Sequence, residues 1–178
     1  MDPPLAGTNA GQASGAPPQL RPPRNLVSPR AIRYWTARAL GGWLVVVLAQ
    51  VFLMVLVHDG VVRFQVIALA VTIVVAAAHV VVMPRWRFRV HRWEVTANAV
   101  YTQSGWFSQE RRIAPISRIQ TVDTERGPLE QLFGLSNVTV TTASAAGPLK
   151  IHGLDRDRAQ ELVDELARAI ESTAGDAT

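Results

Sequence analysis

The chain contains no cysteine, only one lysine, and almost no acidic residue in its first half. The lack of cysteine excludes disulfide bonds, thiolate nucleophiles and metal sites built on cysteine. Charged residues make up only 18% of the 178 residues, whereas 48% are apolar, and the mean hydropathy is +0.14. This composition disfavours an ordinary water-soluble domain, which carries a larger charged fraction.

The charge is distributed unevenly along the chain. Residues 1–92 carry ten arginines against two acidic residues, a net charge of +8, whereas residues 93–178 carry eight basic and twelve acidic residues, a net charge of −4. The overall charge of +4 therefore comes from the first half alone. Because the second half is acidic, we expect no nucleic-acid partner, which would require a basic surface on the folded domain.

Proline is concentrated at the start of the chain. Residues 1–29 hold seven of the eleven prolines and few side chains large enough to bury, a composition that predicts a disordered arm. The first apolar run begins only near residue 39, which is too late for a secretory signal peptide. We therefore expect the arm to stay attached.

Two long apolar runs follow the arm. From Ala39 to Val57 only Gln50 is polar, and from Val66 to Met83 only Thr72 and His79 are polar. A helix of about 20 residues rises about 30 Å, the thickness of the hydrocarbon core, and satisfies its own backbone hydrogen bonds. Both runs are apolar on every face, and the rest of the chain is too short to bury them, so membrane spans are favoured over core helices.

The two runs predict a transmembrane helical hairpin over residues 30–84, with spans at about 39–57 and 64–83. Arginines flank the outer ends of both spans, and only Arg63 lies between the spans. The positive-inside rule then predicts a multi-pass protein of the cell (inner) membrane with both termini cytoplasmic. Pro84 is expected to end the second helix, because proline lacks the backbone N–H.

After the hairpin the pattern changes from helical to β. Short β-prone segments alternate with turns, and the first is expected at residues 86–95, where Trp86, Phe88 and Val90 alternate with arginines. Residues 136–142 (SNVTVTT) give the strongest strand signal, because β-branched residues fit a pleated surface. From Asp155, a suitable N-cap, apolar residues recur at helical spacing. The predicted fold class is α+β: residues 85–172 form an antiparallel β-sandwich or partly open barrel with a C-terminal capping helix, and residues 173–178 form a tail.

Two short segments of this domain, residues 118–122 (RIQTV) and 127–135 (GPLEQLFGL), resemble the signature of the bacterial pleckstrin-homology (PH) family of the YdbS type. The resemblance covers about residues 35–172 and includes the order of two spans followed by a domain. It implies a PH-like domain anchored at the membrane and supplies no catalytic role. Such proteins often carry glutamine and arginine before Leu-Phe-Gly-Leu, whereas this chain has Glu130 and Gln131, which weakens an anion-binding role for that turn.

The second segment is expected to shape the fold. Gly127 and Pro128 interrupt a strand, and Gly134 permits a left-handed exit into the next one. Leu129, Leu132 and Phe133 are spaced to share one face of a short helical turn. The residues assigned to this fold motif are Gly127, Pro128, Leu129, Phe133, Gly134 and Leu135.

Polar residues in and after the first segment have two interpretations. Arg118, Gln120 and Asp123 lie beside apolar strand positions. They form either a buried hydrogen-bond network or a recognition patch that faces the membrane, and the network is favoured.

Arginines also follow the second span, at Arg85, Arg87, Arg89 and Arg92. Arginines at this place usually set topology and attract anionic lipid nonspecifically, each by about 1 kcal/mol. A headgroup pocket is the alternative. Residues 96–99 (TANA), the expected equivalent of the cationic loop in phosphoinositide-binding PH domains, contain no cation.

No motif for catalysis or metal binding is present in the sequence. The serines lack a G-x-S-x-G setting, and His58, His79, His91 and His152 show no H-E-x-x-H spacing and are expected at separate places. We therefore expect no enzymatic activity, no cofactor and no metal. His79 lies in a span without a second ionisable residue for a proton relay, so we expect a neutral histidine that is either hydrogen-bonded to a neighbouring helix or snorkelling to the interface.

The sequence as a whole favours a non-enzymatic integral membrane protein. Its PH-like domain is expected to act as a protein-interaction or assembly module at the membrane surface, with a protein partner or a second copy of the chain. One alternative is recognition of anionic lipid headgroups by the juxtamembrane arginines and the PH-like domain, and another is an accessory subunit of a transport system that uses His79. Gly41, Gly42 and the alanines at 76–78 would permit close packing in the hairpin or in an oligomer.

Overall fold

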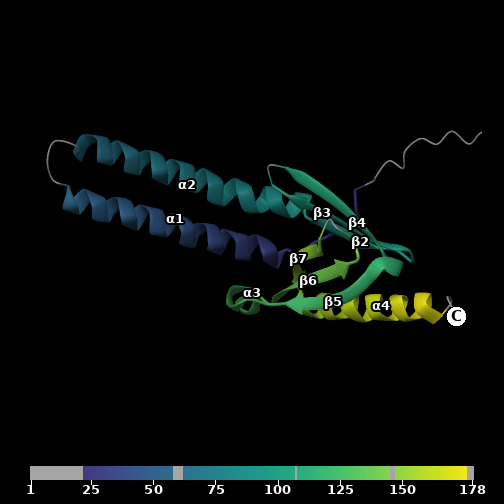
Figure 1. Cartoon of the computed structure of the whole chain (residues 1–178). Coiled ribbons are helices and arrows are strands. Elements are labelled where there is room, and N and C mark those ends of the chain that lie inside the picture. The colour runs from purple at the N-terminus through teal and green to yellow at the C-terminus, as the bar shows by residue number, and fades with distance from the viewer. Residues whose placement is uncertain (1–21, 58–61, 107, 145–146, 176–178) are drawn as a thin grey trace, which may run out of the picture.

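The computed structural model describes residues 22–57, 62–106, 108–144 and 147–175. Two long helices, α1 (Arg30–Leu56) and α2 (Val62–Val90), run side by side and project from one end of a β-rich domain (Figure 1). The other elements, in chain order, are β1 (Asn25–Leu26), β2 (Arg92–Val95), β3 (Ala99–Gly105), β4 (Gln109–Pro115), η1 (Ile116–Arg118), β5 (Ile119–Glu125), α3 (Pro128–Leu132), β6 (Leu135–Thr142), β7 (Leu149–Asp155) and α4 (Arg156–Gly175).

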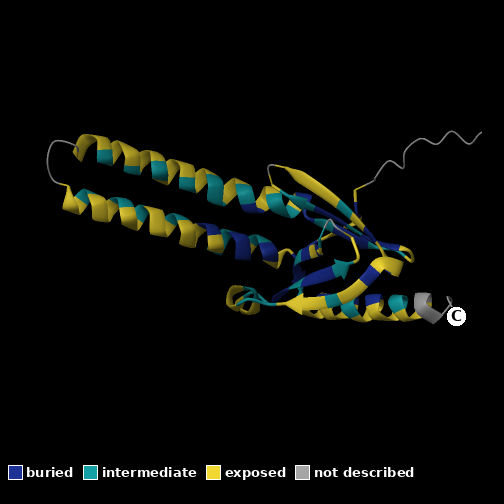
Figure 2. Cartoon of the chain, in the orientation of Figure 1, coloured by how far each residue is buried: buried dark blue, intermediate teal, exposed yellow. Residues whose placement is uncertain are grey.

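The helical hairpin is exposed over most of its length. Figure 2 shows exposed residues around both helices beyond the domain, and both helices are long and apolar enough to cross a membrane. The polar side chains of the two runs pair with one another: Gln50 donates to Thr72 (2.9 Å), and the indole of Trp43 donates to Nδ1 of His79 (3.0 Å). The expected hydrogen bond between His79 and the neighbouring helix is confirmed.

Helix α2 does not end at Pro84, so that prediction is wrong. Pro84 lies inside the helix, which continues to Val90. Proline leaves the carbonyl of Val80 without its backbone donor, and in the same turn the side chain of Arg85 donates to the carbonyl of Val81 (2.7 Å). Trp86 to Val90, whose alternating apolar residues predicted a strand, are therefore helical.

The domain consists of two antiparallel sheets, with strand orders β1-β2-β3-β4 and β5-β6-β7. Among the described residues no strand pairing joins the two sheets, so the domain is an open PH-like sandwich and not a closed barrel. Helix α4 packs against β5, β6, β7 and η1, as expected for a capping helix. It extends to Gly175, and residues 176–178 of the expected tail lie outside the described residues.

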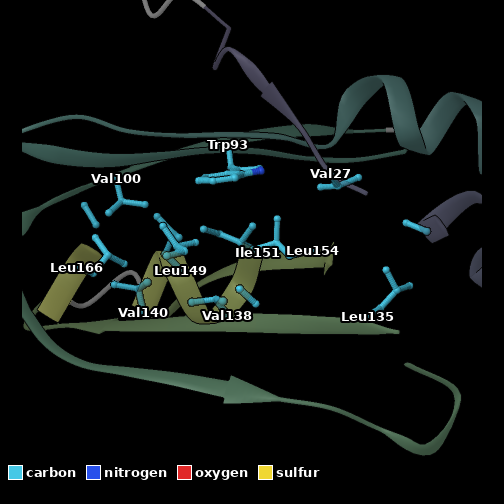
Figure 3. Packing of buried hydrophobic residues seen from close by; sticks show 14 of the residues in the cluster. Val27, Trp93, Val100, Leu135, Val138, Val140, Leu149, Ile151, Leu154 and Leu166 are labelled. Carbon is cyan, nitrogen blue, oxygen red and sulfur yellow. The ribbon is translucent and has the colours of Figure 1, made fainter. Parts of the chain in front are cut away.

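The hydrophobic core lies between the two sheets and beneath α4. Val138 and Val140 of β6 point inward because alternate strand residues share a face (Figure 3). Ala159, Leu162 and Leu166 of α4 are fully buried at helical spacing. Other core residues seen in Figure 3 are Trp93, Val100, Leu149, Ile151 and Leu154.

The last part of the expected disordered arm belongs to the fold. Strand β1 pairs with β2 through Asn25 and Trp93, and Val27 is buried in the core. Ser28 donates to the carboxylate of Asp155 (2.8 Å). Two apolar residues, Leu26 and Val27, among prolines and polar residues give no sequence signal for this strand, which forms because β2 offers an edge. Residues 1–21 of the arm lie outside the described residues.

The first turns of α1 are also part of the domain core. Ala31, Tyr34 and Trp35 are buried there, although they belong to the helix that continues into the first apolar run. Gly153 of β7 has φ of +75°, and a Cβ at this position would lie only 3.0 Å from the Cβ of Ala31. Helix and sheet thus approach closely because glycine has no side chain. Packing, as well as chain connection, fixes α1 to the domain.

Candidate functional site

The structure places the predicted polar residues Arg118, Gln120 and Asp123 at the surface. All three are exposed, and Asp123 accepts a hydrogen bond from Thr121 on its own strand (3.1 Å). The favoured interpretation as a buried network is therefore wrong. Strand β5, of which Gln120 is the second residue, begins at the end of the domain far from the hairpin (Figure 1). A recognition role for these residues stays a prediction.

The four juxtamembrane arginines point in different directions because three of them lie on a helix. Arg85 and Arg89 are one turn apart and exposed, whereas Arg87 is turned toward the domain and half-buried. The side chain of Arg92, at the start of β2, donates to the carbonyl of Arg89 (3.3 Å). Arg87 alone therefore faces the space between hairpin and domain.

The fold motif forms a short helix and a turn. Gly127 precedes α3, Pro128 is its first residue, and Gly134 has the expected left-handed φ of +67°. Leu135 is fully buried, and Phe133 packs edge-to-face on Tyr34 with ring centroids 6.2 Å apart. The other two apolar residues of the turn, Leu129 and Leu132, do not join the core: 44% and 77% of their surfaces are exposed.

A groove lies at the base of the hairpin, where α1 and α2 meet the domain. It comprises two cavities, of about 170 and 370 Å³, that share Arg87 and His152 in their walls. We call it the junction groove. The polar and aromatic residues that line it are Tyr34, Trp35, Arg38, Arg87, His91, Ser104, Trp106, Glu130, Asn137 and His152.

A chain of hydrogen bonds runs along one wall of the groove and links α1 to α3. Arg38 donates to the hydroxyl of Tyr34 (3.2 Å), which donates to Glu130 (2.7 Å). Burial alone would raise the pKa of the Glu130 carboxyl, but hydrogen bonds from Tyr34 and Asn137 and the nearby positive charge of Arg38 outweigh burial, and the pKa is lowered. Glu130 is therefore ionised at neutral pH.

Two guanidinium groups converge on the groove. Arg87 lies over the indole of Trp35, with Cζ 4.8 Å from the ring centroid, a cation–π contact. Arg38 and Arg87 are close enough to repel one another. In the part of the chain that the structure describes, neither guanidinium lies within salt-bridge distance of a carboxylate. The groove thus carries more positive than negative charge and can accept an anion.

Two histidines line the same groove, so the expectation that the histidines lie at separate places is wrong for His91 and His152; His58 lies outside the described residues. Burial, together with the charges of Arg87 and His152, lowers the pKa of His91 to about 4, although a hydrogen bond to the carbonyl of Arg87 acts in the opposite direction. Burial and the charges of Arg87 and Lys150 also lower the pKa of His152. Both imidazoles are neutral at neutral pH and offer hydrogen bonds without charge.

Sequence reasoning missed most of this site. Tyr34, Trp35 and Arg38 all lie in or beside the groove, although in the sequence they stand out only as residues that precede the first apolar run. The one sequence feature that pointed to this site was Glu130, which replaces glutamine in the motif, because a partly buried carboxylate needs a hydrogen-bond donor. No group of three or more histidine, aspartate or glutamate side chains that could hold a metal ion occurs among the described residues.

Comparison with known proteins identifies the family. The family model described as bacterial PH domain matches residues 43–170. This chain belongs to the bacterial PH domain family. It is 27% identical over 162 residues to the UPF0699 transmembrane protein YdbS of Bacillus subtilis (strain 168), and this match covers 86% of the chain and 97% of that protein. No solved structure matches the chain.

These matches confirm the resemblance seen in the sequence. The similarity to a transmembrane protein over nearly its whole length, together with two apolar helices, shows that this bacterial PH domain protein is a transmembrane protein. The bacterial PH domain match also extends from the hairpin to α4, so hairpin and sandwich belong to one family unit.

Proposed function

We propose that this transmembrane protein is a non-enzymatic recognition module of the cell membrane, with both termini cytoplasmic, and that its junction groove binds an anionic group. The observation that carries the proposal is the convergence of Arg38 and Arg87 without a carboxylate partner among the described residues. Arg87 is half-buried, and an unpaired guanidinium that is partly removed from water is costly unless an anion compensates it; Arg38 is exposed and adds a second positive charge at the rim of the groove. Phosphate suits this pair because its oxygens accept charge-assisted hydrogen bonds from two guanidiniums.

The position of the groove favours a lipid phosphate as the anion. Arg38 immediately precedes the first apolar run, which begins at Ala39, and Arg87 follows the second run, which ends at Met83, by about one helical turn. When these runs span the hydrocarbon core, both guanidiniums lie at the level of the lipid headgroups. The amide of Asn137 and the imidazole of His152 line the same cavity and offer further donors.

The proposal is tested with the full-length chain in detergent. Native mass spectrometry would compare retention of added phosphatidylglycerol, phosphatidylcholine and inorganic phosphate. We expect retention of phosphatidylglycerol by the unaltered chain and its loss in Arg87→Gln and Arg38→Gln. Arg85→Gln is the matched control, because it removes the same charge from an exposed position on the same helix. Equal retention by Arg85→Gln and Arg87→Gln would refute the groove, and retention of inorganic phosphate alone would refute the lipid.

A second candidate function is the interaction or assembly module. It is favoured by the outer edge of β5, which pairs with no strand among the described residues and exposes Gln120 and Asp123. Such an edge can accept an extended segment of a partner or of a second copy. Because the chain has no cysteine, Gln120→Cys can be crosslinked specifically in native membranes, with Gln160→Cys on the exposed face of α4 as control. Adducts formed only from Gln120→Cys would support the module.

The third role, an accessory transport subunit that uses His79, has no supporting observation in the hairpin. Nδ1 of His79 accepts a hydrogen bond from Trp43, and the imidazole lies against the rings of Trp43 and Trp106. These contacts give His79 a structural role between α1, α2 and the β3–β4 turn.

A further inference from the structure

Two separate parts of the domain expose apolar side chains on the side from which the hairpin projects. One is helix α3, where Leu132 is exposed over 77% of its surface and Leu129 over 44%. The other is the end of the β3–β4 hairpin, where Trp106 is exposed over 49%. Figure 1 shows α3 beside α1 and the β3–β4 end beside α2, so the two parts flank the helical hairpin.

The depth of Trp106 follows from its contacts with α2. Its ring lies 5.8 Å from the ring of His79, edge-to-face, and its carbonyl accepts a hydrogen bond from the indole of Trp86 (3.0 Å). His79 belongs to the apolar run that ends at Met83. The ring of Trp106 therefore reaches past the end of this run to the level at which Trp43 and His79 lie, which is the depth where tryptophan is enriched in membrane proteins.

The polar side chains of α3 form hydrogen bonds within the protein, whereas its leucine side chains are exposed. Glu130 accepts a hydrogen bond from Tyr34, and the side chain of Gln131 donates to the carbonyl of Arg126 (3.3 Å). The contact with Tyr34 also fixes the height of α3, because Tyr34 lies one turn before Arg38, the last charged residue before the first span. Leu129 and Leu132 are thus presented beside the hairpin near the start of the membrane.

We propose that the domain inserts these two sites, Trp106 on one side of the hairpin and Leu129 with Leu132 on the other, into the headgroup region of the same leaflet. The occupant of both exposed surfaces is the bilayer that the hairpin already spans. Together with the hairpin, they hold the domain at three places and keep it from tilting. Insertion is driven by removal of apolar surface from water and requires no anionic lipid.

The absence of cysteine gives a direct test. Single-cysteine variants Leu132→Cys and Trp106→Cys of the full chain would carry an environment-sensitive fluorophore and be reconstituted in phosphatidylcholine vesicles that contain brominated acyl chains. Leu44→Cys, an exposed position of the first span, is the control for lipid contact. Gln160→Cys, exposed on α4, is the control for water.

We expect the labels at positions 132 and 106 to lose emission in brominated lipid as the label at position 44 does, while the label at position 160 keeps its emission. Emission like that of position 160 at either site would overturn the proposal. Neither substitution removes a buried side chain, so the domain keeps its core in both variants. The vesicles contain no anionic lipid, and the result is therefore independent of anion binding in the junction groove.

Discussion

Acidification should loosen the junction between the hairpin and the domain, because a buried histidine lies within it. Only 4% of the surface of His91 is exposed. Its ring packs against Trp35 with centroids 5.2 Å apart, and its Nδ1 lies 2.8 Å from the carbonyl of Arg87. A proton on His91 would place a second cation in a poorly solvated site next to the Arg87 guanidinium, and the folded state would be destabilised.

The direction and size of the effect follow from the pKa of His91. Burial lowers this pKa from the ordinary 6.5 to about 4, and the charge of Arg87 adds to the lowering. Between these two pH values the unfolded chain binds more protons than the folded one, so stability is complete above pH 6.5 and is lost as the pH falls toward 4. The gap between the two pKa values corresponds to about 3 kcal/mol. The lowered pKa of His152 acts in the same direction.

The measurement is chemical unfolding of the full chain in detergent at a series of pH values from about 7 down to about 4. His91→Phe is the informative variant, because it retains an aromatic ring against Trp35 and cannot be protonated. We expect this variant to be less stable than the unaltered chain at neutral pH and to show a clearly weaker decline on acidification. An equally steep decline in both proteins would refute the assignment of the pH dependence to His91.

Two further predictions concern packing. Gly153→Ala should lower the free energy of unfolding more than Gly147→Ala does. Both positions have left-handed φ, so each alanine costs about 1 kcal/mol in strain, but only at Gly153 would the new Cβ press on α1. Equal losses of the two variants in denaturant unfolding would contradict the close contact. Leu135→Ala should cost about 2–5 kcal/mol through a core cavity. Leu132→Ala should leave the thermal midpoint nearly unchanged, and a comparable fall in both leucine variants would show that Leu132 is buried.

The elements that the sequence predicted are those whose pattern is local and long. Two apolar runs, the alternating residues of β6 and the helical spacing of α4 each specify their own conformation. Residues 86–90 could not be assigned in this way, because five residues with alternating apolar side chains fit a strand as well as a helix. The structure extends α2 through them, since adding a residue to an existing helix avoids the cost of nucleation.

The junction groove was not predictable because its residues come from distant parts of the chain. Tyr34 and Glu130 are 96 positions apart, and no spacing rule relates them. The prediction also gave the four juxtamembrane arginines equivalent roles, which followed from expecting a strand after Pro84. On the actual helix, residues two positions apart face opposite sides, so Arg87 enters the groove while Arg85 and Arg89 remain outside.

The attachment of the hairpin explains why the site lies where it does. A domain that needed only a tether would follow its spans through a flexible linker. Here a single residue separates the end of α2 from the start of β2, and α1 begins inside the domain core, against Gly153. Because both connections are rigid, the spans fix the height of the domain above the bilayer. If the spans lie as proposed, the junction groove is held at the level of the lipid phosphates and is open to groups at that depth. Such a fixed height would distinguish the protein from a soluble PH domain, which must find the membrane by its affinity alone.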